Sequence, residues 1–139
     1  MSMPNNEDEM IPKVHSIIKR TYGVPRCVAK NIEIMGRKPD ILYIYDSEPE
    51  AVAVELKIND WRRGLAQALS YTLIAKYVYL AIRYIRKRNI DLEPFKLYGI
   101  GVIAVNDNPH IVVEARPSVF YKHQVMKEYT NKLCKGKVY

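Results

Sequence analysis

The sequence is poor in the residues that build metal clusters and disulfide frameworks. It contains two cysteines, Cys27 and Cys134, which are far apart and show no zinc or iron–sulfur ligand spacing. This pattern predicts two reduced thiols in an intracellular protein. The three histidines also form no recognisable cluster. The chain therefore gives no sign of a zinc, iron–sulfur or histidine-based site.

Long hydrophobic runs are missing as well. No apolar stretch approaches the ~20 residues that a membrane-spanning helix needs. The first residues, MSMPNNEDE, are polar and acidic, which excludes a signal peptide. We therefore expect a cytoplasmic protein without a membrane partner. Since there are no repeats and no long linker, we also expect a single domain over residues 1–139, with residues 1–8 flexible.

Positive charge is what the chain has in excess. Lysine and arginine number 22 against 15 aspartates and glutamates, a formal net charge of +7. Such a surface attracts polyanions, chiefly through phosphate contacts, so DNA is the expected partner. The basic residues cluster at Arg37-Lys38, at Arg62-Arg63, from Arg83 to Arg88 and near the C-terminus.

Hydrophobic periodicity and turn residues predict a mixed order of helices and strands. The order α-β-β-β-α-β, followed by further β and α, favours an α/β (α+β) fold with a central mixed β-sheet flanked by helices. Arg83 to Pro94 is expected to be irregular, with at most a short helix. Helices are predicted over Met10–Arg20, from Trp61 to about Lys76 and from Ser118 to about Leu133; strands over Cys27–Met35, Asp40–Tyr45, Ala51–Ile58, Tyr77–Ile82, Gly99–Val105 and His110–Glu114.

Two charged residues share one face of the strand predicted at Ala51–Ile58. Alternate residues of a strand point to the same side, so Glu55 and Lys57 follow two alanines on one face, and apolar residues occupy the other. Burying these charges unpaired would be costly. They need each other, a metal ion or a substrate phosphate; the simplest alternative is a structural Glu–Lys ion pair.

Asp40 joins this face only in some registers of the hairpin that precedes Glu55. A four-residue loop sets Asp40 on the face of Glu55 and Lys57, whereas a symmetric five-residue loop sets it opposite Leu56, on the other face. We predict the four-residue loop, which brings two carboxylates and a lysine together.

The helix after Lys57 places three polar side chains on one stripe. Arg63, Gln67 and Tyr71 are spaced four residues apart. The stripe could face the charged residues and contact a phosphate or base. Alternatively, Tyr71 packs in the core and Gln67 has a capping role. Arg62 and Arg63 stand beside the positive helix end, which an anionic partner or a solvated face would explain.

This pattern resembles the PD-(D/E)xK nuclease superfamily. The signature maps onto Pro39-Asp40 and Glu55-Leu56-Lys57, and the stretch from Gln67 to Tyr71 is similar to the QxxxY motif of the branch with RecB-type nuclease domains. Archaeal Holliday-junction resolvases have a similar length and acid-acid-lysine set, but this chain lacks their basic Arg-Lys-Gly start. The resemblance covers roughly the middle quarter of the chain and implies a restriction-endonuclease-like core.

The resemblance also implies roles for individual residues. Asp40, Glu55 and the Leu56 carbonyl would hold Mg²⁺ or Mn²⁺, ions that prefer oxygen ligands. Lys57 would orient the attacking water, with Gln67 completing the catalytic set. A further acid on the first helix is expected, with Glu9 the first candidate and Glu7 the second. Nucleic-acid contacts are expected from Arg37, Lys38, Arg62, Arg63 and Tyr71.

The function predicted from the sequence is a metal-dependent DNA endonuclease. The chain would act as a homodimer, since cutting both strands of a duplex needs two sites or two passes, and its apolar late strands and the helix after Pro117 give candidate surface. Two alternatives belong to other classes: a catalytically inactive nucleic-acid-binding or assembly module, and a structural protein with an incidental ion pair.

Overall fold

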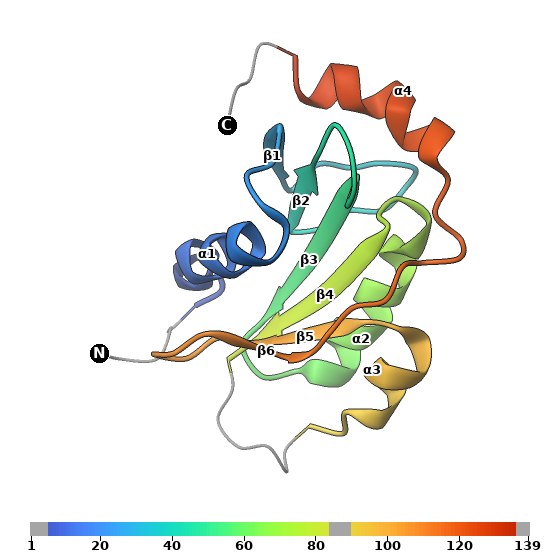
Figure 1. Ribbon diagram of the computed structural model, residues 1–139. Helices are drawn as coiled ribbons and strands as arrows, with labels where there is room; N and C mark the ends of the chain where they lie inside the picture. Colours follow the sequence, from blue (N-terminus) through green and yellow to red (C-terminus); the bar gives the residue numbers. More distant parts are fainter. Residues whose placement is uncertain (1–5, 84–89, 136–139) are drawn as a thin grey trace.

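A single central β-sheet with helices on both faces forms the body of the molecule (Figure 1). The computed structural model describes residues 6–83 and 90–135. The predicted α/β (α+β) class is confirmed. In these residues the helices are α1 (Ile11–Tyr22), α2 (Trp61–Ser70), α3 (Glu93–Tyr98) and α4 (His123–Leu133), with short 3-10 turns η1 (Asp8–Met10) and η2 (Tyr71–Leu73); the strands are β1 (Cys27–Lys30), β2 (Ile41–Ile44), β3 (Ala51–Lys57), β4 (Tyr77–Ile82), β5 (Gly101–Ala104) and β6 (His110–Val113).

The strands lie side by side in chain order and form a mixed sheet. The first three make an antiparallel meander, β4 and β5 join in parallel to β3, and β6 returns antiparallel. Because β3 and β4 run in the same direction, the chain must cross between them, and α2 makes that crossing. The crossing carries α2 directly over the end of β3 that bears Glu55 and Lys57.

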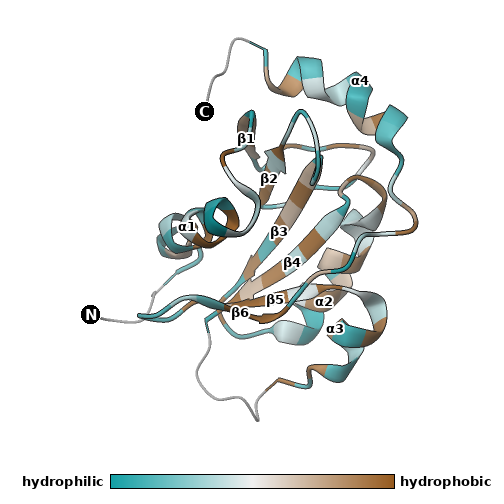
Figure 2. Cartoon of the chain, in the orientation of Figure 1, coloured by the Kyte–Doolittle hydropathy of each residue, from teal (hydrophilic) through white to brown (hydrophobic). Residues whose placement is uncertain are grey.

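Each face of the sheet buries its own apolar cluster, and Figure 2 shows the apolar colouring concentrated along the central strands. Val14 and Ile18 of α1 pack against Val52 and Val54 of β3 on one face. Elements α2, α3 and α4 cover the other face. The alternation predicted for β3 is therefore confirmed: its two alanines lie under α2, and its valines lie under α1.

Several helices and strands begin or end at other residues than predicted. Strand β1 stops at Lys30, and the chain then turns with Asn31 and Met35 at positive φ. Helix α2 ends at Ser70 and tightens into η2. The structure adds α3 and starts α4 only at His123. Residues 1–5 and 84–89, which include most of the predicted flexible end and of the Arg83–Arg88 cluster, lie outside the described residues. No helix in the described part is long and apolar enough to cross a membrane.

The prediction of two free thiols is wrong. Cys27 at the start of β1 and Cys134 after α4 form a disulfide, with Cα atoms 5.6 Å apart and both residues buried. Sequence separation gave no hint of this pairing, because α4 folds back beside the edge strand β1. The bond closes a loop across most of the chain, which restricts the unfolded state and holds the C-terminal helix on the body.

Candidate active site

The hairpin between β2 and β3 determines whether a site exists, and it has the four-residue loop. Ile41 pairs with Val54, and Tyr45 donates its backbone N–H to the carbonyl of Glu50. Continuing this register by one residue sets Asp40 opposite Glu55. The predicted four-residue loop is therefore confirmed and the five-residue alternative is excluded, and the charge of Asp40 acts on Glu55.

Glu55 is the buried charged residue at the centre of this arrangement. It is 2% exposed, and both of its carboxylate oxygens have partners. The hydroxyl of Tyr71 donates to Oε1 at 2.6 Å, and Nζ of Lys57 lies 3.4 Å from Oε2. The same hydroxyl lies 3.1 Å from the carbonyl oxygen of Lys38. Tyr71 therefore links Glu55 to the backbone just before Asp40.

The surroundings of Glu55 favour its protonated form. Burial is the largest cause and raises the pKa of Glu55 to about 7. The negative charge of Asp40 adds to this rise, while the Tyr71 hydrogen bond and the charge of Lys57 oppose it. Two acids within electrostatic reach of each other disfavour each other's ionisation. A bound cation would favour the ionised form of both.

Asp40 lies at the sheet edge, where its carboxylate extends the hydrogen-bond ladder. Its Oδ2 accepts the backbone N–H of Leu56 at 2.8 Å. In a strand, the N–H and C=O of one residue point to the same side. The Leu56 carbonyl therefore faces this edge too, beyond the first residue of β2. The carboxylate and the carbonyl are two of the three oxygen donors, with Glu55, that the family resemblance implies for a metal ion.

A small hollow opens beside Asp40 and contains acids from the first helical turn. Its volume is about 170 Å³, and its lining includes Glu7 and Asp8 but not Glu9. Helical spacing explains this choice, because Glu7 stands three residues before the buried Met10 and shares its inward face. Glu9, the first sequence candidate, is exposed. The spacing to Met10 was the signal that could have identified Glu7, and Asp8 was missed. The hollow is lined by Glu7, Asp8, Ile11, Lys30, Asn31, Asp40 and Leu56.

The donors present fit a hard divalent cation. Mg²⁺ and Mn²⁺ prefer carboxylate, carbonyl and water oxygens, and Asp40, Glu55 and the Leu56 carbonyl offer these. Among the described residues, no three His, Cys, Asp or Glu side chains lie together as a metal-binding group. The cation would therefore take its remaining ligands from the Leu56 carbonyl and from water.

A glycine lets α2 lie directly on Lys57. A Cβ built on Gly64 would come within 2.9 Å of Cγ of Lys57 and 2.6 Å of Cδ1 of Leu80. The missing side chain therefore allows the helix to cover the aliphatic stem of Lys57, whose side chain is 16% exposed. The start of α2 is fixed by Asp60, whose carboxylate accepts the backbone N–H of Arg63. The close packing at Gly64 and the cap at Asp60 therefore fix the position of α2 relative to the Lys57 side chain.

The stripe predicted on α2 divides into residues with different roles. Tyr71 is 3% exposed, so the expected contact with nucleic acid is not met; its role is to hold Glu55. Gln67 lies one turn earlier and is partly buried, and its Oε1 is buried without a hydrogen-bond partner. A buried acceptor without a donor is costly. Gln67 is therefore the residue here that a water or ligand would satisfy.

The predicted basic contacts also differ from one another. Arg37 is committed to the fold: its Nε donates to the carbonyl of Ser70 and its Nη1 to the carbonyl of Met35. Arg62 stacks on the ring of Trp61, with 4.5 Å from Cζ to the centroid. Arg63 and Lys38 are exposed. Of the four, Arg63 and Lys38 are the side chains most available to a phosphate.

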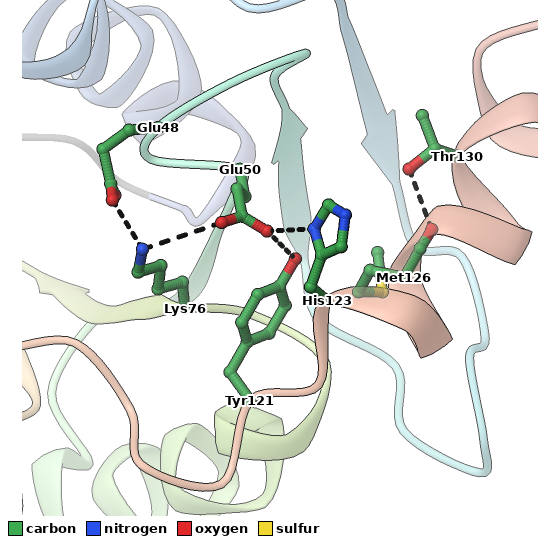
Figure 3. A network of polar contacts seen from close by, with 7 residues as sticks. All are labelled: Glu48, Glu50, Lys76, Tyr121, His123, Met126 and Thr130. Carbon is green, nitrogen blue, oxygen red and sulfur yellow. Dashed lines mark hydrogen bonds and ion pairs between the residues drawn. The ribbon is translucent and has the colours of Figure 1, made fainter.

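A second polar network surrounds Glu50, just before β3 begins (Figure 3). Its Oε1 accepts hydrogen bonds from Nδ1 of His123 at 2.5 Å and from the Tyr121 hydroxyl at 3.1 Å. Nζ of Lys76 lies 3.7 Å from Oε2 and also contacts Glu48. Partial burial acts to raise the pKa of Glu50, but His123, Tyr121 and Lys76 outweigh it and lower the value. This network holds the start of α4 to the hairpin.

Comparison with known proteins gives the fold but not the chemistry. No family model and no curated protein matches the chain. A solved structure, a protein of unknown function from Silicibacter pomeroyi, is similar with a TM-score of 0.70. It is 11% identical, and the similarity covers 96% of this chain and 86% of that chain. At this identity the similarity supports the α+β architecture over nearly the whole chain, and function is argued from the site.

Proposed function

We propose that this chain is a metal-dependent nuclease that hydrolyses phosphodiester bonds of DNA at Asp40, Glu55 and Lys57. One observation carries the proposal: Asp40 continues the register of β2 opposite Glu55, its charge acts on Glu55, and the nitrogen of Lys57 lies 3.4 Å from the Glu55 carboxylate. The element order α-β-β-β-α-β through β4 is the order that the PD-(D/E)xK resemblance implies. The proposal therefore includes a restriction-endonuclease-like core.

In this proposal each residue has a distinct task. Asp40, Glu55 and the Leu56 carbonyl hold a Mg²⁺ or Mn²⁺ ion, and Glu7 lines the small hollow together with Asp40 and Leu56. When bound, such an ion lowers the pKa of a coordinated water and offsets charge on the attacked phosphate. Lys57 orients the water and offsets further phosphate charge. Tyr71 keeps the Glu55 carboxylate in place, and Gln67 offers its unsatisfied oxygen to the water or substrate.

DNA is the proposed substrate because the surface around the site is basic. Lys38 stands two residues before Asp40, and Arg62 and Arg63 lie in the first turn of the helix that covers Lys57. With the formal net charge of +7, these residues favour a polyanion. No base-reading motif accompanies them, so recognition of the phosphate backbone is the expected mode. An endonuclease that cuts both strands would work as a homodimer, which sedimentation at micromolar concentration tests.

A second function has an observation in its favour. Both oxygens of Glu55 are already engaged, and the residue is 2% exposed, so the carboxylate is closed in by protein groups. A binding or assembly module that kept the fold without cleavage would have such a stable internal pair. Cleavage would require a metal ion to reach the lone pairs of these oxygens that Lys57 and Tyr71 leave open.

A nuclease assay separates the two functions. Supercoiled plasmid is incubated with the protein in Mg²⁺, in Mn²⁺ and in EDTA, and nicked and linear products are measured. The nuclease proposal expects product with either metal and none in EDTA. An inactive module would bind the plasmid under all conditions and leave it intact.

A further inference from the structure

Exposed apolar side chains gather around one groove on the face opposite α1. Of six large hydrophobic residues exposed in the described parts of the chain, four line this groove. Leu97 is 71% exposed and Tyr98 56%, and both lie on α3. Val119 is 85% exposed and Phe120 60%, in the segment before α4. Apolar surface of this density, gathered in one place, marks a binding site rather than chance exposure.

The groove has a volume of about 500 Å³ and a floor from the sheet and α2. Val78 of β4, Ile100 and Leu69 of α2 form its apolar walls. Leu69 and Thr72 flank Tyr71, whose hydroxyl holds Glu55. The same turn of chain therefore supports the carboxylate of the candidate active site and forms part of the groove.

The charges at the groove are positive. Its charged lining residues in the described chain are Lys76 and Arg116. Lys76 is engaged by Glu48 and Glu50, but Arg116 donates only to the backbone carbonyls of Lys96 and Leu97. These bonds hold the guanidinium in place and leave its full charge uncompensated by a carboxylate. Exposed Lys96 and Lys122 each stand two residues from a groove aromatic.

We infer that this groove binds an unpaired segment of nucleic acid, with bases on Tyr98 and Phe120 and phosphates on Arg116. Exposed aromatic rings beside cations are the combination by which proteins bind single strands, since every base offers a face for stacking. This inference deepens the proposed function and rests on it, because it gives the nuclease a substrate with a single-stranded or splayed portion.

Charge argues against a second copy of the chain as the occupant. A symmetric dimer through this groove would bring Arg116 of both copies to one interface without a carboxylate lining it. A polyphosphate chain complements the same surface.

The test measures binding of fluorescein-labelled oligo(dT) of 15 nucleotides by anisotropy in EDTA. The protein carries Glu55→Gln, so that cleavage does not enter the measurement. Phe120→Ala and Tyr98→Ala should each weaken binding by about tenfold, the effect expected for one base–aromatic stack. Phe120→Tyr should bind like the parent. Val24→Ala, which shortens an exposed apolar side chain outside the groove, should change binding less than about twofold.

Binding of duplex DNA of 15 base pairs is measured in the same way, to show whether the groove requires unpaired bases. Its bases are stacked inside, so Phe120→Ala should affect it far less than it affects oligo(dT). Unchanged oligo(dT) binding in both alanine variants would overturn the inference. So would a dimer that Phe120→Ala dissociates in sedimentation, since the groove would then bind a second copy. Absent plasmid cleavage by the unmodified protein would refute the nuclease proposal and leave this binding result standing.

Discussion

Glu50 directly precedes β3, and Glu55 lies near the C-terminal end of the same strand. Each accepts a hydrogen bond from a tyrosine hydroxyl and forms an ion pair with a lysine. Their pKa values nevertheless move in opposite directions. Glu55 is 2% exposed, and burial, with Asp40 nearby, raises its pKa to about 7. Glu50 is partly solvated, and the bonds from His123 and Tyr121 outweigh burial and lower its pKa.

The difference separates a structural network from a candidate reactive one. Around Glu50, Lys76 pairs with both Glu48 and Glu50, and His123 and Tyr121 donate to the Glu50 carboxylate, so it is stable as an anion and ties α4 to the hairpin. Around Glu55, burial and the charge of Asp40 disfavour the anion, and Tyr71 and Lys57 offset them only in part. Perturbed carboxylates are frequent at active sites, which makes Glu55 rather than Glu50 the candidate metal ligand.

The largest expected difference between substitutions at Glu55 and at Glu50 is in the rate of DNA cleavage. Asp40→Asn, Glu55→Gln and Lys57→Met should each lower Mg²⁺-dependent plasmid cleavage by at least ~100-fold, because each removes a metal ligand or the group that orients the water. A double variant should be little worse than a single one, since the residues act as a unit. Initial rates of nicking measure this.

Glu50→Gln is the matched control on the same strand. It should keep cleavage within about threefold of the unmodified protein, because Glu50 only fastens α4. Equal losses for Glu50→Gln and Glu55→Gln would mean that the assay reports folding and not the site.

The pH dependence of stability should differ in sign. The folded-state pKa of Glu55 is raised to about 7 from 4.5, so as pH rises between these values the unfolded chain loses this proton first. Stability therefore falls over that range, by up to about 3 kcal/mol. Glu55→Gln should be more stable than the unmodified protein at pH 8, as measured by urea unfolding.

Glu50 should behave in the opposite way. Its folded-state pKa is lowered, so it contributes stability above its unfolded pKa that is lost as pH falls through the folded value. Glu50→Gln should therefore be slightly less stable at pH 8, by about 1 kcal/mol or less for a partly exposed network. A stabilised Glu50→Gln with a destabilised Glu55→Gln would reverse the comparison.

The two tyrosines offer a smaller, local test. Tyr71→Phe removes the donor at 2.6 Å from a buried carboxylate, and should lower the free energy of unfolding by roughly 1–3 kcal/mol. Because that bond favours the charged form, the pKa of Glu55 should rise further, which carbon-detected NMR of the carboxyl measures. Tyr121→Phe, the matched change at Glu50, should cost less. Equal costs would show that burial does not distinguish the two sites.

How far the sequence could predict the site depends on the range of the interactions. Alternation along β3 and the spacing of turn residues are local, and they correctly predicted the four-residue loop between β2 and β3. Burial is not local. The sequence left Tyr71 open between a nucleic-acid contact and a core residue, because its packing depends on how α2 crosses β3 and β4.

Pairings between distant segments were the least predictable. The Cys27–Cys134 disulfide and the bond from His123 to Glu50 both depend on α4 returning to the first strands, which no local pattern encodes. The choice of Glu9 over Glu7 had a different cause. Glu7 stands three residues before Met10, which is buried, so helical spacing favours Glu7 over Glu9 for the inward face.

Salt dependence should show which end of β3 meets DNA, with the smallest expected change. Neutralising Arg62 and Arg63 together should weaken binding to all sequences alike and reduce the slope of log affinity against log salt by roughly two. The matched double change at the Glu50 end, Arg26→Gln with Lys127→Gln, should leave the slope nearly unchanged. Equal slopes for both double variants would remove the assignment of DNA to the Glu55 end.

Calorimetric titration with Mn²⁺ tests the central claim most directly. The account predicts one ion bound per chain at pH 7.5, with binding lost in Asp40→Asn and in Glu55→Gln and retained in Glu50→Gln. Proton release should accompany binding, because Glu55 must ionise to hold the ion and its pKa is about 7. Mn²⁺ binding that is unchanged in Glu55→Gln would contradict the account.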